Sequence, residues 1–194
     1  PEIAPGVLGM TALSTLLELA ADYDAVLLGP GLGRQEETME LVRQFAAQTE
    51  CPLILDADAI YAFNGRGTEL KNLKHIPILT PHLGEMASLL QLSVPELRES
   101  LVDMSREAAR EYQAIFVVKS ECTIVVYPEG PVFFTSHGNA GMASAGCGDV
   151  LAGTIAGLFG QLRSSLAPLA GVYLHGLAGD LATEEAGDGL VASD

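Results

Sequence analysis

The sequence is poor in positive charge. Only 10 of its 194 residues are Lys or Arg, against 25 Asp or Glu, and the formal net charge is −15. Broad contact with nucleic acid or with an anionic membrane surface needs clustered positive charge. We therefore expect neither as a partner. We also expect backbone N–H groups to do much of the work in holding any bound phosphate.

Cysteine motifs and long apolar runs are also missing. The three cysteines, Cys51, Cys122 and Cys147, are odd in number and lack the C-x-x-C spacing of zinc and redox sites, so we expect reduced thiols. No apolar run reaches the roughly 18 residues that indicate a transmembrane helix, and the apolar opening has no basic leader. These absences predict a soluble, cytoplasmic protein.

The chain does have enough apolar sequence for one sizeable core. Of its residues, 48% are hydrophobic and 18% are charged, which predicts one globular domain over residues 1–194. Both ends look cut, because the chain opens on PEIAPG with little ahead of its first clear strand and closes on GLVASD without a terminator. We therefore expect a single domain that is truncated at both ends.

Short apolar runs alternate with helical patterns. Apolar runs lie at 25–29, 52–55 and 76–80, and the last two are too uniformly apolar to be half exposed, which is typical of parallel strands covered on both faces. Helices are predicted at about 36–48 and 95–112, the second leading into a strand at 115–118. The alternation predicts an α/β fold with right-handed β-α-β crossovers.

The second half of the chain begins with a predicted hairpin. Residues 123–127 and 131–135 are rich in β-forming residues and are separated by the short turn Pro-Glu-Gly, so we expect a mixed sheet at one edge. Leu151, Ile155, Leu158 and Leu162 then recur at helical spacing, and residues 169–185 carry a second helical pattern.

A glycine-rich turn, GNAGMASAGCG at 138–148, follows a strand and opens a helix. Unpaired N–H groups and the positive end of the helix dipole converge at such a point, and small residues let an anion approach closely. The turn therefore predicts a phosphate site. Asp149 follows it directly, either as the base that takes a proton from an attacking hydroxyl or as an acidic residue that stabilises a helix start.

Other polar or flexible positions follow predicted strands, where ligands bind in open α/β sheets. Gly33 ends the turn GPGLG, either to touch a ligand or because a tight turn requires glycine. Asp56 and Asp58 follow the next strand, and the pair is open to a metal-binding interpretation or to turn and capping roles. His175 lies among leucines in the last helical pattern and is interpreted as a packed histidine outside the site.

Six segments together resemble the ribokinase-like superfamily and, within it, the ADP- or ATP-dependent NAD(P)H-hydrate dehydratases. They are AVLLGPGLGR (25–34), LILDADAI (53–60), LTPHLGE (79–85), VVKSECT (117–123), GNAGMASAGCGD (138–149) and YLHGLAGD (173–180). The resemblance implies a three-layer α/β/α ribokinase-like fold, with a mostly parallel central sheet and an antiparallel edge hairpin. It also implies that sequence belonging to the domain is missing at both ends.

The implied reaction is the repair of hydrated NADH or NADPH with ADP or ATP and Mg²⁺. Phosphorylation converts a poorly leaving hydroxyl into phosphate, which leaves readily as the ring nitrogen donates electrons. Resemblance to the bacterial branch favours ADP as the donor, and family members often form homo-tetramers. A small-molecule kinase of the same fold and a nucleotide-binding module without catalysis are the alternatives.

The resemblance also implies residue roles around the glycine-rich turn. Gly146, Cys147 and Gly148 match the anion hole, with Gly148 also touching the nucleotide phosphate, and Asp149 matches the base. The adenine-nucleotide segment, usually K-G-x-x-T, corresponds to Lys119, Ser120, Glu121, Cys122 and Thr123. Ser120 replaces the usual Gly, which puts a positive φ at this position in doubt.

The implied binding residues for the hydrated dinucleotide are Gly33, His82 and Asp149. His82 stands where related vitamin kinases carry Asn in an N-x-x-E pattern, and Glu85 ends that pattern. By resemblance, Glu85 holds Mg²⁺ through water. From the residues alone, His82 can instead be a helix-entry residue bonded to nearby backbone, and Glu85 an acidic residue in a first helical turn.

Overall fold

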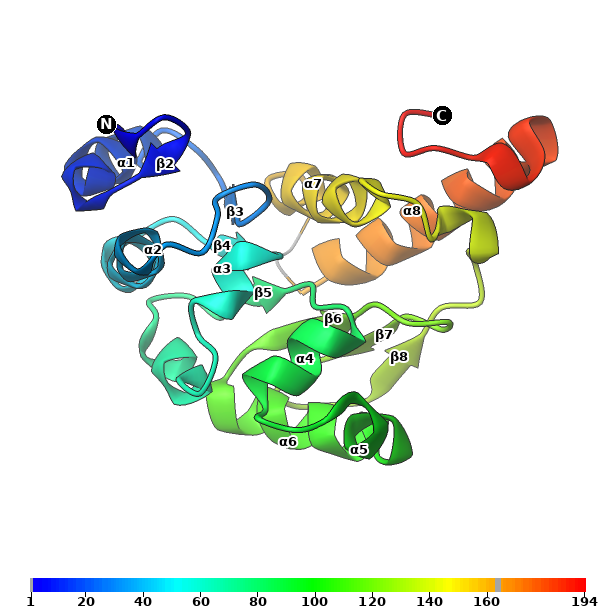
Figure 1. Cartoon of the computed structure of the whole chain (residues 1–194). Coiled ribbons are helices and arrows are strands. Elements are labelled where there is room, and N and C mark those ends of the chain that lie inside the picture. The colour runs from blue at the N-terminus through cyan, green and yellow to red at the C-terminus, as the bar shows by residue number, and fades with distance from the viewer. Residues whose placement is uncertain (1, 163–164) are drawn as a thin grey trace.

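The structure, a computed structural model, describes residues 2–162 and 165–194. Its centre is a six-stranded sheet in the order β3-β4-β5-β6-β7-β8 (Figure 1). The strands are β3 (Val26–Leu28), β4 (Leu53–Leu55), β5 (Ile78–Leu79), β6 (Ile115–Val118), β7 (Ile124–Val126) and β8 (Val132–Phe134). β3 to β6 are parallel, whereas β7 and β8 are antiparallel. The predicted mixed sheet with an edge hairpin is confirmed.

A small unit that the sequence did not indicate precedes β3. It consists of the antiparallel strands β1 (Glu2–Ala4) and β2 (Val7–Leu8), the 3₁₀ turn η1 (Met10–Ala12) and α1 (Leu13–Ala20). β1 is exposed throughout and β2 is only half-buried. Such short strands leave too little hydrophobic periodicity for a prediction.

The remaining helices alternate with the strands along the chain or follow the last strand. They are α2 (Glu36–Gln48), α3 (Asp58–Tyr61), α4 (Leu83–Leu89), α5 (Val94–Glu99), α6 (Leu101–Tyr112), α7 (Cys147–Phe159) and α8 (Ala167–Ala186), with 3₁₀ turns η2 (Gly67–Asn72), η3 (Ala140–Met142) and η4 (Gly187–Gly189). None of the helices in the described ranges is long and apolar enough to cross a membrane.

Two helix predictions need correction. The single helix predicted over 95–112 is two helices, because Ser100 leaves the helical region with φ −138° and ψ 34°. Leu162 lies beyond the end of α7, which stops at Phe159 with Gly160 as its C-cap. Glycine favours helix ends because it costs helix interiors stability, so the apolar spacing continued past the helix itself.

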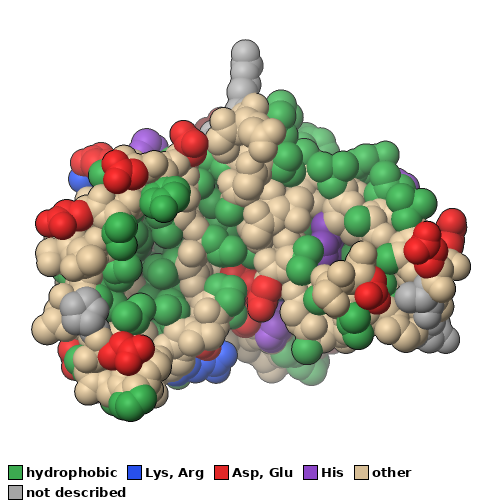
Figure 2. All heavy atoms as spheres, turned by 90° about the horizontal axis from the view of Figure 1, so that it is seen from above, with side chains coloured by type: hydrophobic (Ala, Val, Ile, Leu, Met, Phe, Trp, Pro, Cys, Tyr) green, Lys and Arg blue, Asp and Glu red, His purple; other side chains and the backbone are tan. Residues whose placement is uncertain are grey.

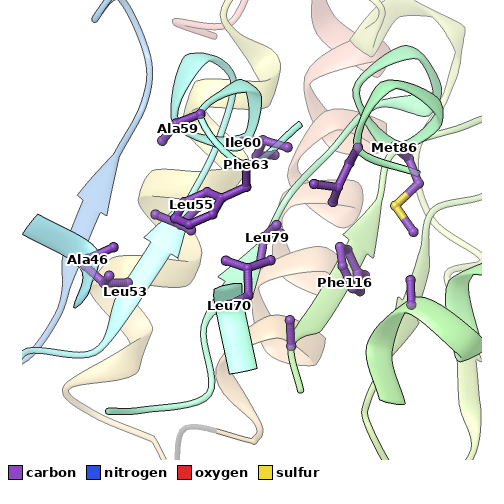
Figure 3. Close-up of a cluster of buried hydrophobic side chains, with 14 of the residues drawn as sticks. Ala46, Leu53, Leu55, Ala59, Ile60, Phe63, Leu70, Leu79, Met86 and Phe116 are labelled. Atoms are coloured by element: carbon purple, nitrogen blue, oxygen red, sulfur yellow. The ribbon is translucent and has the colours of Figure 1, made fainter. Parts of the chain in front are cut away.

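Alternate residues of β3 to β7 enter two different cores, which produces three layers. On one face, Leu55, Leu79 and Phe116 pack with α2 to α6 (Figure 3). On the other face, Ile54 and Val117 pack with α7 and α8. Figure 1 shows α7 and α8 on one side of the sheet and α4 to α6 on the opposite side. The predicted α/β/α architecture is confirmed, and it leaves the ends of the strands free to carry a site.

The carboxyl ends of the parallel strands meet at one edge of the sheet. Gly29 follows β3, Asp56 follows β4, Thr80 follows β5 and Lys119 follows β6. Backbone hydrogen bonds continue the ladder past the strands, because Asp56 N donates to Leu28 O at 3.0 Å and Thr80 N donates to Leu55 O at 3.1 Å. These bonds fix the residues that build the site.

Candidate active site

A cavity of about 770 Å³ lies at this edge of the sheet. Its walls come from the loops that follow β5 and β6, from the turn before α7 and from α8. Its volume falls within the range of small-molecule sites. The predicted site residues that line it are His82, Lys119, Ser120, Glu121, Thr123, Cys147 and Gly148.

Five predicted site residues lie outside the lining of the cavity: Gly33, Glu85, Cys122, Gly146 and Asp149. Asp149 directly follows the lining residue Gly148 and is exposed in the first turn of α7. Within the described ranges its carboxylate has neither a hydrogen bond nor an ion pair. An exposed carboxylate without a protein partner is free to meet a ligand hydroxyl at the rim of the cavity.

The first turn of α7 is built for an anion. Gly146 adopts a left-handed conformation, with φ 93°, and so turns the chain sharply into the helix. Val150 N donates to Gly146 O at 3.0 Å, while Cys147 N points back to Ser144 O at 3.4 Å. The N–H groups of Gly148 and Asp149 precede that first helical bond, so they can donate hydrogen bonds to a phosphate.

Lys119 brings the only side-chain ammonium group among the described lining residues. Its Nζ donates to Asp56 Oδ1 at 2.9 Å, and the hydroxyl of Thr80 donates to the same oxygen at 2.8 Å. A Cβ on Gly148 would lie 3.1 Å from Lys119 Nζ, so the ammonium group lies against the start of α7. A positive charge and the positive end of a helix dipole therefore face the same space.

The paired carboxylates Asp56 and Asp58 do not share a ligand. Ala57 separates them with φ 47° and ψ −118°, and the two side chains have different partners. Asp58 accepts a hydrogen bond from Gly33 N at 3.0 Å and another from Arg34 Nε at 2.7 Å. The described residues contain no group of three or more His, Cys, Asp or Glu placed to hold a metal ion. Asp58 therefore has a turn role, but the N-cap of α3 is Ala57 and has no side-chain cap hydrogen bond, so the capping role is not supported.

Asp58 also fixes the GPGLG loop. Gly33 has φ 75°, and its N–H is held by Asp58, so this turn does require glycine. The Arg34 guanidinium lies 4.5 Å from the centre of the Tyr61 ring. Its hydrogen bond to Asp58 raises the pKa of Arg34, and the charge of Glu85 adds a smaller contribution.

His82 and Glu85 form a capping box at the start of α4. His82 Nδ1 accepts hydrogen bonds from Gly84 N at 2.9 Å and Glu85 N at 3.2 Å, while Glu85 Oε2 accepts one from His82 N at 2.9 Å. The helix-entry interpretation of His82 is therefore confirmed. Its side chain is still 60% exposed and borders the cavity, so the ring has a face for a ligand.

The backbone of Ser120 shows whether a residue that replaces the usual glycine adopts a positive φ. The non-glycine residues with positive φ in the described ranges are Ala57, Gln91 and Gln113, so Ser120 does not adopt that conformation. Its hydroxyl donates to Cys122 O at 2.7 Å and closes the turn instead. Glu121 pairs with Arg98 of α5 at 3.0 Å. A hydrogen bond from its own backbone and the Arg98 contact lower the pKa of Glu121.

Sequence reasoning missed the residues that hold the glycine-rich turn. Asp180 of α8 accepts hydrogen bonds from Gly138 N at 3.1 Å and from Asn139 Nδ2 at 3.0 Å. Thr183 donates to Asn139 Oδ1 at 3.0 Å. The segment YLHGLAGD contains Asp180, but the helical pattern around it does not say which loop its side chain meets.

His175, which the sequence places outside the site, is a packed helix histidine that also borders the cavity. The residue lies in α8, as predicted. Burial lowers the pKa of His175, and a smaller opposing effect comes from a hydrogen bond with the backbone of Cys147. The ring is therefore neutral at physiological pH, and it adds no charge beside Lys119.

Asp180→Ala should loosen the turn over 138–142. Without the carboxylate, Gly138 N and Asn139 lose a shared partner, so we expect faster amide hydrogen exchange there and lower nucleotide affinity. Glu184→Ala, one helical turn away on an exposed position, is the matched control. Asp180 has a lowered pKa, mainly because Asn139 donates a hydrogen bond to it. The wild-type turn should therefore be fully protected from hydrogen exchange above pH 3.8, the ordinary pKa of Asp, and should lose protection as the pH falls through the lowered pKa. Equal exchange in the two variants would contradict this role.

Comparison with known proteins agrees with this geometry. The sequence model of the NAD(P)H-hydrate dehydratase family matches residues 2–194. The bifunctional NAD(P)H-hydrate repair enzyme of Moorella thermoacetica is 41% identical, and the match covers 100% of this chain and 37% of that protein. The chain therefore spans just over a third of the length of that curated relative.

Two solved structures share the fold. One is the ADP/ATP-dependent NAD(P)H-hydrate dehydratase from Bacillus subtilis crystallised with ATP and Mg²⁺, with a TM-score of 0.75, 30% identity, and coverage of 91% of this chain and 64% of the other. The other is a ribokinase-like superfamily protein from Enterococcus faecalis, with a TM-score of 0.77, 30% identity, and coverage of 92% and 62%. The chain thus has the ribokinase-like fold, and it belongs to the NAD(P)H-hydrate dehydratase family.

Proposed function

We propose that residues 1–194 form a catalytic domain that dehydrates hydrated NADH or NADPH at the expense of ADP or ATP. The observation that carries the proposal is the shared cavity. Within it, the nucleotide segment that begins at Lys119, the phosphate turn at Gly148 and the ring of His82 face one space, with Asp149 at its rim. A phosphoryl donor and a hydroxyl-bearing acceptor can therefore meet beside one free carboxylate.

The reaction divides into two steps. In the first, the hydroxyl oxygen of the hydrated ring attacks the terminal phosphorus of the nucleotide, Asp149 accepts the hydroxyl proton, and the P–O bond to the shortened nucleotide breaks. The N–H groups of Gly148 and Asp149 stabilise the transferring group. In the second, the C–O electron pair leaves with phosphate as the ring nitrogen donates its own pair, and loss of a neighbouring C–H proton restores the double bond.

The carboxylate that this site offers Mg²⁺ is that of Glu85. Glu85 uses Oε2 to accept the His82 N–H, and its Oε1 lies 3.4 Å from His82 Nε2. Mg²⁺ at nucleotide sites takes most of its ligands from phosphates and water, with one or two carboxylates, so Glu85 can contact it through water. The ion would neutralise phosphate charge, while Lys119 and the start of α7 hold the nucleotide.

We further propose ADP as the favoured donor, a cytoplasmic location and assembly into a homo-tetramer. The resemblance to the bacterial enzymes supports the choice of donor. Figure 2, which looks onto the α7 and α8 side, shows hydrophobic side chains spread over this face. The exposed hydrophobic residues of α7 and α8 include Val150, Tyr173, Leu174 and Leu181, which favours burial against other copies. Sedimentation of the protein at several concentrations tests the tetramer.

Nucleotide consumption separates this function from its alternatives. The dehydratase consumes ADP or ATP only when a hydrated dinucleotide is present, and it returns intact dihydronicotinamide. A small-molecule kinase consumes nucleotide with another acceptor and stops at the phosphorylated product. A binding module consumes none. Following nucleotide by chromatography, with and without hydrated NADPH, tells the three apart.

Two substitutions of His82 separate its capping role from contact with the substrate. His82→Ala removes both the cap and the ring, and the lost cap alone should cost about 1 kcal/mol of stability. His82→Asn restores a good N-cap and still removes the ring. We expect both variants to use hydrated NADPH poorly, with a raised KM, while ADP affinity changes little. Full recovery of KM in the Asn variant would show that His82 acts only as a cap.

A further inference from the structure

The best-buried carboxylate of the site is one to which neither the family resemblance nor the two-step chemistry gives a role. Asp56 is 1% exposed and Thr80 is 0% exposed, and both lie at strand ends, where Asp56 bonds to the cavity-lining Lys119. A charge this deep is costly unless it is paired and hydrogen-bonded. Asp56 has both kinds of partner, because Lys119 Nζ and Thr80 Oγ1 donate to the same Oδ1.

The backbone around Asp56 is strained in a way that fixes its side chain. Ala57 has φ 47° and ψ −118°, a conformation that a residue with a Cβ adopts at a cost. The bend sends Asp56 toward Lys119, whereas Asp58 on the other side of it bonds to Gly33 and Arg34. Strain of this kind persists where the surrounding structure holds it, and it gathers at functional sites.

Lys119 depends on Asp56 for its orientation. Its backbone is fixed, because Lys119 N donates to Pro81 O at 2.8 Å and the residue forms a parallel bridge with His82. Its side chain has one hydrogen-bond partner in the described part of the chain, Asp56 Oδ1. An ammonium group has three N–H donors, so two remain for the cavity and the start of α7. A flexible stem held at one point can then present the rest of its charge in one direction.

We propose that Asp56 is the positioning residue for Lys119 and thereby sets the affinity of the site for the phosphates of an adenine nucleotide. This inference rests on the proposed function in one respect, the placing of nucleotide phosphates beside Gly148. Without a nucleotide, the carboxylate balances an ammonium group that faces the positive end of α7. With one bound, the pair holds the ammonium group where the phosphate arrives, at no cost in side-chain ordering.

A double-mutant cycle on ADP binding, measured by calorimetry, tests the proposal. We expect Asp56→Asn to weaken ADP binding about 10-fold and Lys119→Met to weaken it about 10-fold to 100-fold, as charged hydrogen bonds do. The double variant should bind no more weakly than Lys119→Met alone, because Asp56 acts through that lysine. Adenosine, which has no phosphate, should bind all four proteins equally.

Two further variants keep the test decisive. Thr80→Val removes one donor to Asp56 Oδ1 and should weaken ADP binding less than Asp56→Asn, and not at all in the Lys119→Met background. If Asp56→Asn does not fold, this pair carries the test. Thr38→Val is the matched control, because Thr38 is also 0% exposed but its hydroxyl donates to Leu8 O of β2. It should leave ADP binding unchanged.

The outcomes test the positioning role of Asp56 separately from the dehydratase function. The positioning role would be overturned if Asp56→Asn weakened ADP binding further in the Lys119→Met background. It would also be overturned if the substitutions weakened adenosine binding as much as ADP binding. A wild-type protein that does not bind ADP at all would overturn it as well. A cycle that behaves as expected in a protein that never consumes hydrated NADPH would support the positioning role and reject the dehydratase.

Discussion

Replacing Asp149 by Asn is expected to lower turnover of hydrated NADPH by about 100-fold to 10,000-fold, the usual range for loss of a general base. The amide has nearly the same shape as the carboxylate but cannot accept the hydroxyl proton. Both ligands should still bind, so kcat falls while the two dissociation constants stay within a few-fold of wild type. Steady-state kinetics and calorimetry measure these quantities.

A control is needed because Asp149 also lies in the first turn of α7, where a negative charge stabilises the helix. Asp103→Asn removes an exposed first-turn carboxylate from α6, a helix that contributes no residue to the cavity lining or to the predicted site. Each substitution should cost no more than about 1 kcal/mol of stability through the helix dipole. Near-full activity of Asp149→Asn would remove the base from the mechanism, whatever its effect on stability.

Gly29→Ala is expected to be the most damaging single change to the fold at the site. Gly29 has φ +139°, and a Cβ there would collide with the backbone carbonyl oxygen of Asp56. Backbone strain and overpacking together should cost roughly 3 kcal/mol or more. Asp56 would have to move, and the strand-end ladder to Leu28 would open with it. Urea unfolding at constant m-value measures the loss.

Gly31→Ala is the matched control for that prediction. Gly31 belongs to the same GPGLG turn and has φ +73°, but a Cβ there would meet no atom within 4 Å. It should therefore cost only the left-handed conformation, about 1 to 2 kcal/mol. Equal losses in the two variants would mean that contact with Asp56 contributes nothing, and that positive φ alone explains why both positions are glycine.

The central strands β4 to β7 were predictable because they are buried on both faces. Uniform apolar runs such as Leu53–Leu55 have one simple explanation in an α/β chain, and Pro-Glu-Gly between two β-rich runs specifies a hairpin. The start of α7 was predictable for a related reason, since small residues followed by an apolar helical pattern mark the turn. Ser100, which splits α5 from α6, is of a type that favours caps and turns, but it makes no side-chain cap bond here, and one polar residue is a weaker signal than an apolar run.

The side-chain network of the site was not predictable from local patterns. Asp56 and Asp58 are two residues apart and look like a pair, yet the bend at Ala57 sends them to different partners. Lys119 is separated from Asp56 by 63 residues, and Asp180 from Asn139 by 41. Contacts at such separations depend on how layers pack, and periodicity reports only which face of an element is buried.

The measurement that tests the central claim most directly is the recovery of dihydronicotinamide absorbance. The full-length protein is mixed with hydrated NADPH and Mg²⁺, and ADP or ATP is added in separate reactions. We predict recovery with ADP, accompanied by equal amounts of AMP and phosphate, and none with Asp149→Asn. A folded protein that binds ADP but restores no absorbance with either nucleotide would contradict the dehydratase and leave a kinase with another acceptor.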